Sequence, residues 1–268
     1  MSTRRLFALS DIHVDFDENR AWVQQLSRFD YTDDVLLLAG DVSDFPHLLL
    51  DCLQQFSKCF HRVLFVPGNH DLWVERSQEG MDSLQKLGLI RRMAEDCGVL
   101  CGPWREGDLL CVPLQGWYDY SFAAPSSRLL EAWMDFVACR WPEGMREAAQ
   151  ICAHFLQQNE ALLDLQATRI VSFSHFMPRP DLFPENVPPI RRLILPVLGS
   201  LGLDAQLRRL GSRLHLYGHS HLNRQVWRDG VLYVNNAFAY PRESNIAAKQ
   251  LLCLDPLLQQ AYAGNVKS

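Results

Sequence analysis

The stretch VLLLAGDVSD at residues 35–44 reads as a buried β-strand followed by a turn of small and acidic residues. An unbroken apolar run is typical of a strand that is covered on both faces, as in the sheets of α/β proteins. Gly40 allows the backbone to turn sharply after the strand, so the carboxylate of Asp41 is expected at the strand's carboxyl end. Open α/β sheets bind their ligands at that end. The stretch therefore predicts a fold class and the place of a site.

Four further runs repeat this arrangement of an apolar strand followed by side chains that can bind a metal. They are LFALSDIH (6–13), VLFVPGNHD (63–71), IVSFSH (170–175) and LHLYGHSH (214–221). Carboxylate, amide and imidazole groups are the donors that hold hard or borderline divalent metals. Because the carboxyl ends of several strands can meet at one rim, the runs predict a single metal site.

The strand ends offer seven candidate metal ligands, which are Asp11, His13, Asp41, Asn69, His175, His219 and His221. Asp11 and His13 stand two residues apart, and in an extended chain such residues point to the same side. Seven ligands exceed what one ion needs. A carboxylate can bridge, so Asp41 shared between two ions would give each ion four protein ligands. Asp71 is expected to fix its own turn through backbone hydrogen bonds.

Predicted strands and helices alternate along the chain. The strands are expected at 5–10, 35–39, 63–66, 109–113, 170–174, 213–217 and 231–234, and the helices at about 19–29, 47–59, 81–97, 127–138, 145–165 and 200–211. This alternation is typical of an α/β protein with helices on both faces of largely parallel sheets. The tail runs VLYVNNAF and KQLLCLD are expected to be strands that close an antiparallel edge. A length of 268 residues suits a single domain over 1–268.

Two stretches rich in aromatic residues, proline and arginine interrupt the alternation, at 115–145 and 176–196. Each follows a predicted strand on the side of the metal site, where long loops are commonly functional. We expect them to form the walls or lid of a substrate pocket, with irregular crossovers as the alternative. Candidate substrate contacts are arginines for a phosphate and aromatic rings for stacking, with ordinary loop packing as the alternative: Arg179, Arg191, Arg192, Trp117 and Tyr118.

The composition argues against several classes of protein. The formal net charge is −5 and no run of basic residues occurs, so no nucleic-acid partner is expected. No segment approaches the roughly 20 apolar residues of a membrane span, and the short apolar run before Asp11 does not read as a secretory signal. We therefore expect a cytoplasmic protein without a membrane partner, whose eight cysteines are reduced. The oligomeric state has no signal in the sequence.

The ordered motifs Asp-x-His, Gly-Asp-x-x-Asp, Gly-Asn-His-Asp, His and Gly-His-x-His resemble those of the calcineurin-like metallophosphoesterase superfamily. The resemblance runs from Asp11 to His221 and includes every block. It implies a four-layer αββα sandwich of two mixed β-sheets flanked by helices. It also implies two divalent ions, one held by Asp11, His13, Asp41 and His221, and the other by Asp41, Asn69, His175 and His219.

The implied chemistry is hydrolysis of a phosphate ester. Two ions about 3.5–4 Å apart can generate a bridging hydroxide for in-line attack and can neutralise the phosphoryl oxygens. His70 is adjacent to a ligand but is not one, and its imidazole suits protonation of the leaving group. Asp44 matches the family position that pairs with this histidine. Mixed oxygen and imidazole ligands admit Mn, Fe, Zn, Co or Ni, and Mn is favoured.

The substrate class follows less directly from the motifs. The Gly-Asn-His-Asp block is similar to that of cyclic-nucleotide phosphodiesterases of the superfamily, so a small organic phosphodiester or nucleotide is favoured, with a phosphomonoester as the alternative. A nuclease with the same metal site is disfavoured by the negative net charge. Phe45 and Pro46 follow Asp44 where the family's protein phosphatases carry an arginine. A non-catalytic scaffold is disfavoured because every ligand position is intact.

Overall fold

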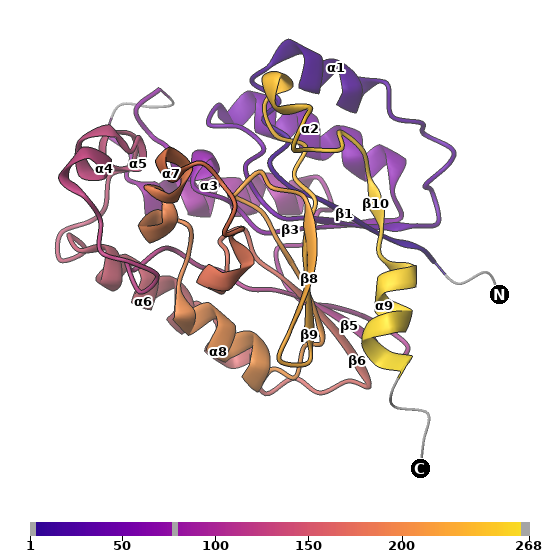
Figure 1. Ribbon diagram of the computed structural model, residues 1–268. Coiled ribbons are helices and arrows are strands. Elements are labelled where there is room, and N and C mark those ends of the chain that lie inside the picture. Colours follow the sequence, from indigo (N-terminus) through magenta and orange to yellow (C-terminus); the bar gives the residue numbers. More distant parts are fainter. Residues whose placement is uncertain (1–3, 77–79, 264–268) are drawn as a thin grey trace.

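Two β-sheets pack face to face at the centre of the molecule (Figure 1). The structure is a computed structural model that describes residues 4–76 and 80–263. The first sheet has the strand order β10-β1-β2-β3, and the second has the order β4-β5-β6-β7-β9-β8. The strands of the first sheet are β1 (Leu6–Leu9), β2 (Val35–Leu38), β3 (Arg62–Phe65) and β10 (Leu252–Cys253). Those of the second are β4 (Trp104–Glu106), β5 (Leu109–Pro113), β6 (Arg169–Phe173), β7 (Leu214–Tyr217), β8 (Arg224–Arg228) and β9 (Val231–Asn235).

Both sheets are mixed, with a parallel centre and antiparallel edges. Strands β1, β2 and β3 run parallel, and β10 pairs antiparallel with β1. Strands β5, β6, β7 and β9 run parallel between the antiparallel edge strands β4 and β8. The predicted antiparallel edge from the tail is confirmed for β10. Parallel centres place the carboxyl ends of consecutive strands at the same rim, which is what the metal-binding runs require.

Strands β1 and β2 have no polar face, because both faces of their sheet are covered. In β1, Leu6 and Ala8 lie in the core between the sheets, whereas Phe7 and Leu9 lie in the core beneath the helices. Strand β2 alternates in the same way, with Val35 facing the other sheet. Successive side chains of a strand point to opposite faces, so an all-apolar run signals burial on both sides.

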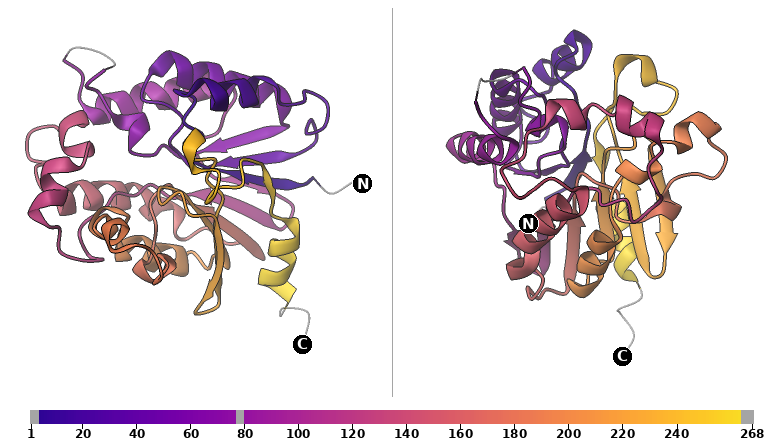
Figure 2. Two further views of the ribbon diagram at one scale, coloured as in Figure 1. Left: turned by 45° about the horizontal axis from the view of Figure 1, so that its top comes forward. Right: turned by 90° about the vertical axis from the view of Figure 1, so that its left-hand side faces the viewer.

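Helices cover the outer face of each sheet, which completes four layers (Figure 2, left). On one side lie α1 (Asp17–Gln24), α2 (Pro46–Cys59) and α3 (Ser83–Asp96), and on the other α6 (Ala148–Asn159) and α8 (Leu201–Arg209). The predicted αββα sandwich is confirmed. Helix α9 (Asp255–Tyr262) packs against β7 and β9. Across the described residues, every helix falls short of the length and apolar character that crossing a bilayer would require.

Several boundaries differ from the sequence-based expectation. The helix expected over 127–138 is two short helices, α4 (Ser127–Ala132) and α5 (Asp135–Ala138), and the one expected over 145–165 ends earlier. Strands β4 and β8 and helix α9 were not expected. Strands β4 and β8 are edge strands whose exposed sequences become regular only by pairing with a neighbour, which a local pattern does not reveal.

The remaining short elements lie in the connections. They are α7 (Pro189–Arg192) and the 3₁₀ turns η1 (His70–Leu72), η2 (Glu160–Leu162), η3 (Pro180–Leu182), η4 (Leu195–Val197) and η5 (Pro241–Glu243). Figure 1 shows α4, α5 and α7 at the opposite side of the molecule from the two chain ends. These helices belong to the two stretches expected as pocket walls.

Candidate metal centre

The structure brings all seven candidate ligands together at the carboxyl ends of β1, β2, β3, β6 and β7. Five of them are almost completely buried, namely Asp11, His13, Asp41, Asn69 and His175. His219 and His221 are partly exposed and face the open side of the cluster. Residues separated by up to 210 positions in the sequence, Asp11 and His221, therefore meet at one rim.

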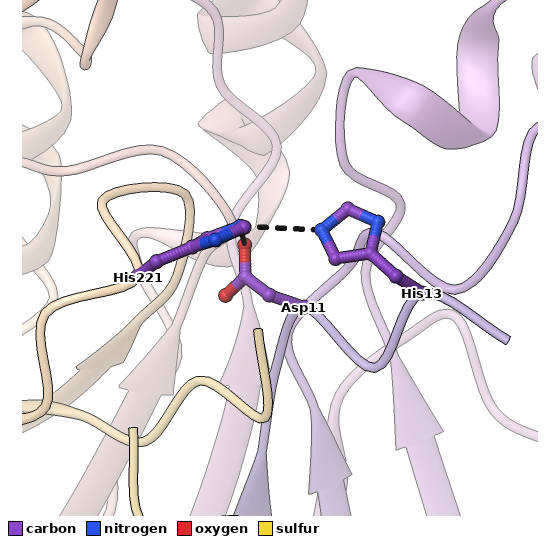
Figure 3. A group of neighbouring side chains, drawn as sticks. All are labelled: Asp11, His13 and His221. Atoms are coloured by element: carbon purple, nitrogen blue, oxygen red, sulfur yellow. Dashed lines mark hydrogen bonds and ion pairs between the residues drawn. The ribbon is translucent and has the colours of Figure 1, made fainter. Parts of the chain in front are cut away.

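One group of ligand atoms comes from Asp11, His13 and His221 (Figure 3). Their donor atoms all lie within 4.8 Å of one another. The Nε2 atoms of His13 and His221 are 3.2 Å apart, and Nε2 of His221 is 3.3 Å from Oδ1 of Asp11. We call this group the first half of the centre.

A second group comes from Asp41, His175 and His219, which also satisfy the 4.8 Å limit. Nε2 of His175 lies 3.1 Å from Nδ1 of His219, 3.0 Å from Oδ1 of Asn69 and 3.4 Å from Oδ1 of Asp41. We call His175, His219 and Asn69 the second half of the centre, and we treat Asp41 separately because it lies near both groups. Asp41 lies between the halves, since its Oδ2 is 3.9 Å from Nε2 of His13.

The protonation of the second half is set by its hydrogen bonds. Nδ1 of His175 donates to the carbonyl of Ala39 (2.9 Å), and Nε2 of His219 donates to the carbonyl of Val197 (3.1 Å). Burial lowers the pKa of both rings to about 4, so each is neutral at pH 7 and carries one proton. The other ring nitrogen of each histidine is then a lone pair that points into the cluster.

The donor set fits a cation. Two imidazole lone pairs, the amide oxygen of Asn69 and a carboxylate oxygen of Asp41 converge in the second half. A neutral imidazole without a proton at the facing nitrogen cannot donate to these acceptors. Converging lone pairs in a buried place repel each other unless a positive charge lies among them. Nitrogen and oxygen ligands of this kind suit borderline divalent metals.

The loops that carry the ligands hold an unusual backbone conformation. Asp11, His13, Asp41, His219 and His221 have φ between 42° and 66°, in the left-handed region that non-glycine residues rarely adopt. Residues in such conformations cost about 1–3 kcal/mol each and persist only where the surroundings hold them. The strain turns these side chains off the line of the strands and into one cluster.

Asp71 supplies much of the restraint on the loop after β2. Its carboxylate accepts from the backbone N–H groups of Asp41 (2.9 Å), Val42 (2.8 Å), Ser43 (3.0 Å) and Gly68 (2.8 Å). Four N–H groups aimed at one carboxylate fix the loop that presents Asp41. The role expected for Asp71, a set of local backbone bonds, extends in the structure to a second loop.

Two glycines of the motifs allow the loops to approach each other. Gly40 has φ +79°, and a Cβ there would lie 2.7 Å from Nδ1 of His175. A Cβ on Gly68 would lie 2.7 Å from the backbone nitrogen of Asp41 and 2.8 Å from Cε1 of His175. A side chain at either position would therefore push the loops of β2 and β3 away from His175.

Two acidic residues that the sequence reasoning did not single out support the ligands from outside. Nδ1 of His221 donates to Glu243 (2.7 Å), which leaves Nε2 facing Asp11. Nδ2 of Asn69 donates to the buried carboxylate of Asp135 (2.8 Å). Such partners orient metal ligands and raise their basicity. No motif marks either residue, because each reaches its ligand only through the fold.

His70 lies at the edge of the centre. Its Nε2 is 3.9 Å from Oδ2 of Asp41, and its ring stacks on Trp73 with a centroid distance of 3.7 Å. Burial, with the neighbouring imidazoles, lowers the pKa of His70 well below its usual value. Its side chain is 20% exposed, so it can reach a substrate.

Asp44 is not placed as expected. Among the described residues no hydrogen bond joins Asp44 to His70, although both line one cavity of about 480 Å³. The Asp44 carboxyl faces Asp15 instead, and burial together with that neighbouring carboxylate raises the pKa of Asp44 to about 6. Its backbone carbonyl accepts from the buried ammonium of Lys86 (2.6 Å).

Of the three arginines expected to contact the substrate, the structure places one at the cavity beside the centre. Arg191 lines a cavity of about 390 Å³ that opens onto the centre. Arg192 is exposed and donates to the carbonyl of Glu185. Arg179 is held in ion pairs with Asp181 (2.9 Å) and Asp229 (2.8 Å).

Trp117 and Tyr118, expected as stacking residues, lie in the core. They are 1% and 2% exposed, and Trp117 packs against Phe176 and Phe155. Their rings are therefore not open to a substrate in this structure. The aromatic composition of the stretch reflects packing beneath the pocket wall, a distinction that residue type alone does not make.

The cavity of about 390 Å³ has apolar walls from both inserted stretches. Ala132, Trp133 and Met134 come from 115–145, and Phe183 and Ile194 come from 176–196. Its floor includes Asp41, Asn69 and the two histidines of the Gly-His-x-His run. The cavity therefore reaches the metal ligands with part of its wall from each of the two stretches.

Comparison with known proteins places this geometry in a family. The family model described as calcineurin-like phosphoesterase matches residues 4–223. A curated relative, the [acyl-carrier-protein] phosphodiesterase PptH of Mycobacterium tuberculosis, is 27% identical over 270 residues, which span 89% of this chain and 78% of the relative.

Solved structures agree with this assignment. The crystal structure of phosphopantetheinyl hydrolase (PptH) from Mycobacterium tuberculosis is similar with a TM-score of 0.75 and 26% identity, over 90% of this chain and 92% of that one. A second crystal structure, at 13% identity and a TM-score of 0.52, shares the fold. The chain belongs to the calcineurin-like phosphoesterase family, and it is a metal-dependent phosphoesterase.

Proposed function

We propose that the centre is dinuclear, with Asp41 bridging two divalent ions. The first half with Asp41 would hold one ion, and the second half with Asp41 would hold the other. The position of Asp41 between His13 and His175 supports this assignment. When bound, the ions supply an activated water and neutralise charge on the phosphoryl group. Mn is the favoured metal, and Fe, Zn, Co and Ni suit the same ligands.

His70 is the proposed proton donor to the leaving group. Its backbone N–H donates to Oδ1 of Asp41 (3.0 Å), whereas its ring nitrogen Nε2 is 3.9 Å from Oδ2 of Asp41, which suits a ring that faces substrate. Its lowered pKa would rise beside a phosphate anion, because an opposite charge favours the protonated ring. The stacked indole of Trp73 holds the ring in place. Asp44 would influence His70 only through the cavity that they share.

The substrate is proposed to be a phosphodiester. Two cavities, of about 390 and 480 Å³, flank the centre, and both are lined by His70, Trp73 and Tyr240. A diester carries an organic group on each side of the phosphorus, whereas a monoester carries one. Two cavities that share His70 fit the former. This shared wall is the observation that carries the proposal.

The diester is proposed to be a phosphopantetheinyl group linked to a carrier protein, as the names of the M. tuberculosis relative describe for that protein. The cavity of about 390 Å³ combines apolar walls with one arginine, Arg191, which suits an extended amide chain ending in a phosphate. The partner would be the carrier, with no nucleic acid and no membrane. The protein is proposed to act in the cytoplasm as a single domain.

The test is a substrate panel after reconstitution with Mn²⁺. Release of phosphopantetheine from a loaded carrier protein is followed by mass spectrometry, beside bis-(p-nitrophenyl) phosphate, p-nitrophenyl phosphate and nucleotides. Hydrolysis of both diesters, with little action on the monoester, is expected. A preference for p-nitrophenyl phosphate would establish the monoesterase alternative. Hydrolysis of none of them, by protein that has bound metal, would leave the non-catalytic scaffold.

A further inference from the structure

Asp135 is a buried carboxylate at the start of α5, inside the stretch 115–145, and it is 3% exposed. It accepts three side-chain hydrogen bonds. Its Oδ1 receives Nδ2 of Asn69 (2.8 Å) and Nε1 of Trp73 (2.7 Å), and its Oδ2 receives Nε1 of Trp133 (2.8 Å). The pocket wall is thereby tied to the loop after β3 through one side chain.

The bond to Asn69 decides which end of that amide faces the metal ligands. An asparagine amide has an oxygen and an NH₂ group of similar size, and rotation by half a turn exchanges them. An ionised carboxylate can only accept, so the NH₂ group must face Asp135. The oxygen then faces Nε2 of His175, at 3.0 Å. Only the oxygen can bind a cation.

The other two bonds of Asp135 also end at the centre. Trp73 stacks on His70, with ring planes 28° apart. Trp133 presents its ring to His219 edge-on, with a centroid distance of 5.9 Å. The carboxylate therefore lies behind one candidate ligand and behind two rings that pack on active-site histidines.

We propose that Asp135 is a positioning residue that makes Asn69 a metal ligand. By fixing the amide, it raises the affinity of the second half for its ion, and it contacts neither the ion nor the substrate. This inference rests on the proposed two-ion centre. The alternative is that Asp135 only anchors α4 and α5 to the body of the protein, in which case its loss would change stability but not the metal affinity of the folded protein.

The test is Asp135→Asn, titrated with Mn²⁺ as metal-free protein by calorimetry. The new amide is nearly the same size but presents either a carbonyl or an NH₂ group to Asn69, so the Asn69 oxygen is no longer held toward His175. The affinity for one ion should fall by about 10–100-fold, as for other partners of metal ligands, while the second ion binds as in the wild type. Thermal unfolding of the metal-free variants reports the structural effect separately.

Trp133→Phe is the matched control. It removes the one bond to Oδ2 and leaves both bonds to Oδ1, so the affinity for both ions should stay within about twofold of the wild type. A loss in this variant equal to that of Asp135→Asn would show a general effect of loosening the wall and would overturn the inference. So would two ions bound by Asp135→Asn with wild-type affinity.

The double variant Asn69→Asp/Asp135→Asn exchanges donor and acceptor. The new amide donates to the new carboxylate, which keeps an oxygen for the ion, so about tenfold of the lost affinity should return. No recovery relative to Asp135→Asn would count against the inference, and this comparison remains valid if the single variant is unstable. If the wild type itself binds no Mn²⁺, the proposed centre is wrong; if it binds two ions and the variants do too, only the role of Asp135 is wrong.

Discussion

The two halves of the centre are supported in different ways. In the second half, each ligand has a buried partner: His175 donates to the carbonyl of Ala39, His219 to that of Val197, and Asn69 to Asp135. In the first half, His221 depends on Glu243, whose side chain is 21% exposed. Buried partners are not weakened by solvent, whereas a partly exposed carboxylate is. The second half is therefore the more rigid side.

The difference follows the chain. Support for the second half comes from the backbone of Ala39 after β2, from Asp135 in the stretch 115–145, and from Val197 at the end of η4, directly after the stretch 176–196. Support for the first half comes from η5, after the last strand of the second sheet. Substitutions in or beside the inserted stretches should therefore change the second half, and substitutions in η5 should change the first half. Asp41 belongs to both halves.

Asp41→Asn should have the largest effect, because it acts on both halves at once. An amide has one oxygen and no charge, so it bridges two cations far less well than a carboxylate. We expect loss of both ions, by elemental analysis of purified protein, together with loss of detectable diesterase activity. Asp181→Asn, the same change in a surface ion pair, should keep both ions. Two ions retained in Asp41→Asn would contradict the bridging role.

His70→Ala should separate chemistry from metal binding. Removing a proton donor typically lowers turnover by about 10²–10⁴-fold, most for poor leaving groups. We expect such a loss in kcat on alkyl diesters, a smaller loss on p-nitrophenyl esters, and unchanged metal content. His154→Ala in α6 is the control for loss of an imidazole outside the centre. If metal content falls with activity, His70 is a ligand and not the acid.

Glu243→Gln should weaken the first half selectively. The glutamine can still accept from Nδ1 of His221 but has lost the charge, so the affinity for one ion should fall by roughly 10-fold. Mn²⁺ titration in parallel with Asp135→Asn measures whether the two variants affect different ions. Glu95→Gln, on the exposed side of α3, serves as the matched change. Equal and overlapping effects would remove the distinction between the halves.

Arg191→Ala tests the wall of the substrate cavity and leaves the metal ligands in place. Loss of one hydrogen bond to a charged group is worth about 1.5–3 kcal/mol, so KM for a carrier-linked diester should rise about 10-fold or more. Arg179→Ala, which breaks ion pairs away from the cavity, should leave KM within about twofold. If both variants behave alike, Arg191 does not contact the substrate.

The sequence-based predictions agree best with the structure where a feature depends on a few neighbouring residues, as strands and turns do. The runs of β1 and β2 are wholly apolar, so their burial in a two-sheet core was predictable. Gly40 predicted a sharp turn, and in the structure a Cβ at Gly40 or at Gly68 would collide with a neighbouring loop. The order of the strand-end motifs then led to the family.

Sequence and structure disagree for residues whose role depends on the orientation of the side chain. Trp117 and Arg191 both occur in stretches expected to form walls, yet Trp117 points into the core and Arg191 into the cavity. Asp44 follows the motif but faces Asp15. Nothing in residue type fixes such orientations, because they result from competition among neighbours that are distant in sequence.

The sequence by itself determined the strand cores, the turns that follow them and the types of metal ligand, since these depend on burial and backbone geometry within a few residues. Only the tertiary structure decided which end of the Asn69 amide faces the centre, which nitrogen of His221 faces Asp11 and which wall residues line the cavity. Asp135 and Glu243 make those choices, and each lies 66 and 22 positions from its ligand, respectively. A hydrogen bond requires its partners to be close in space, and only the folded chain brings these together.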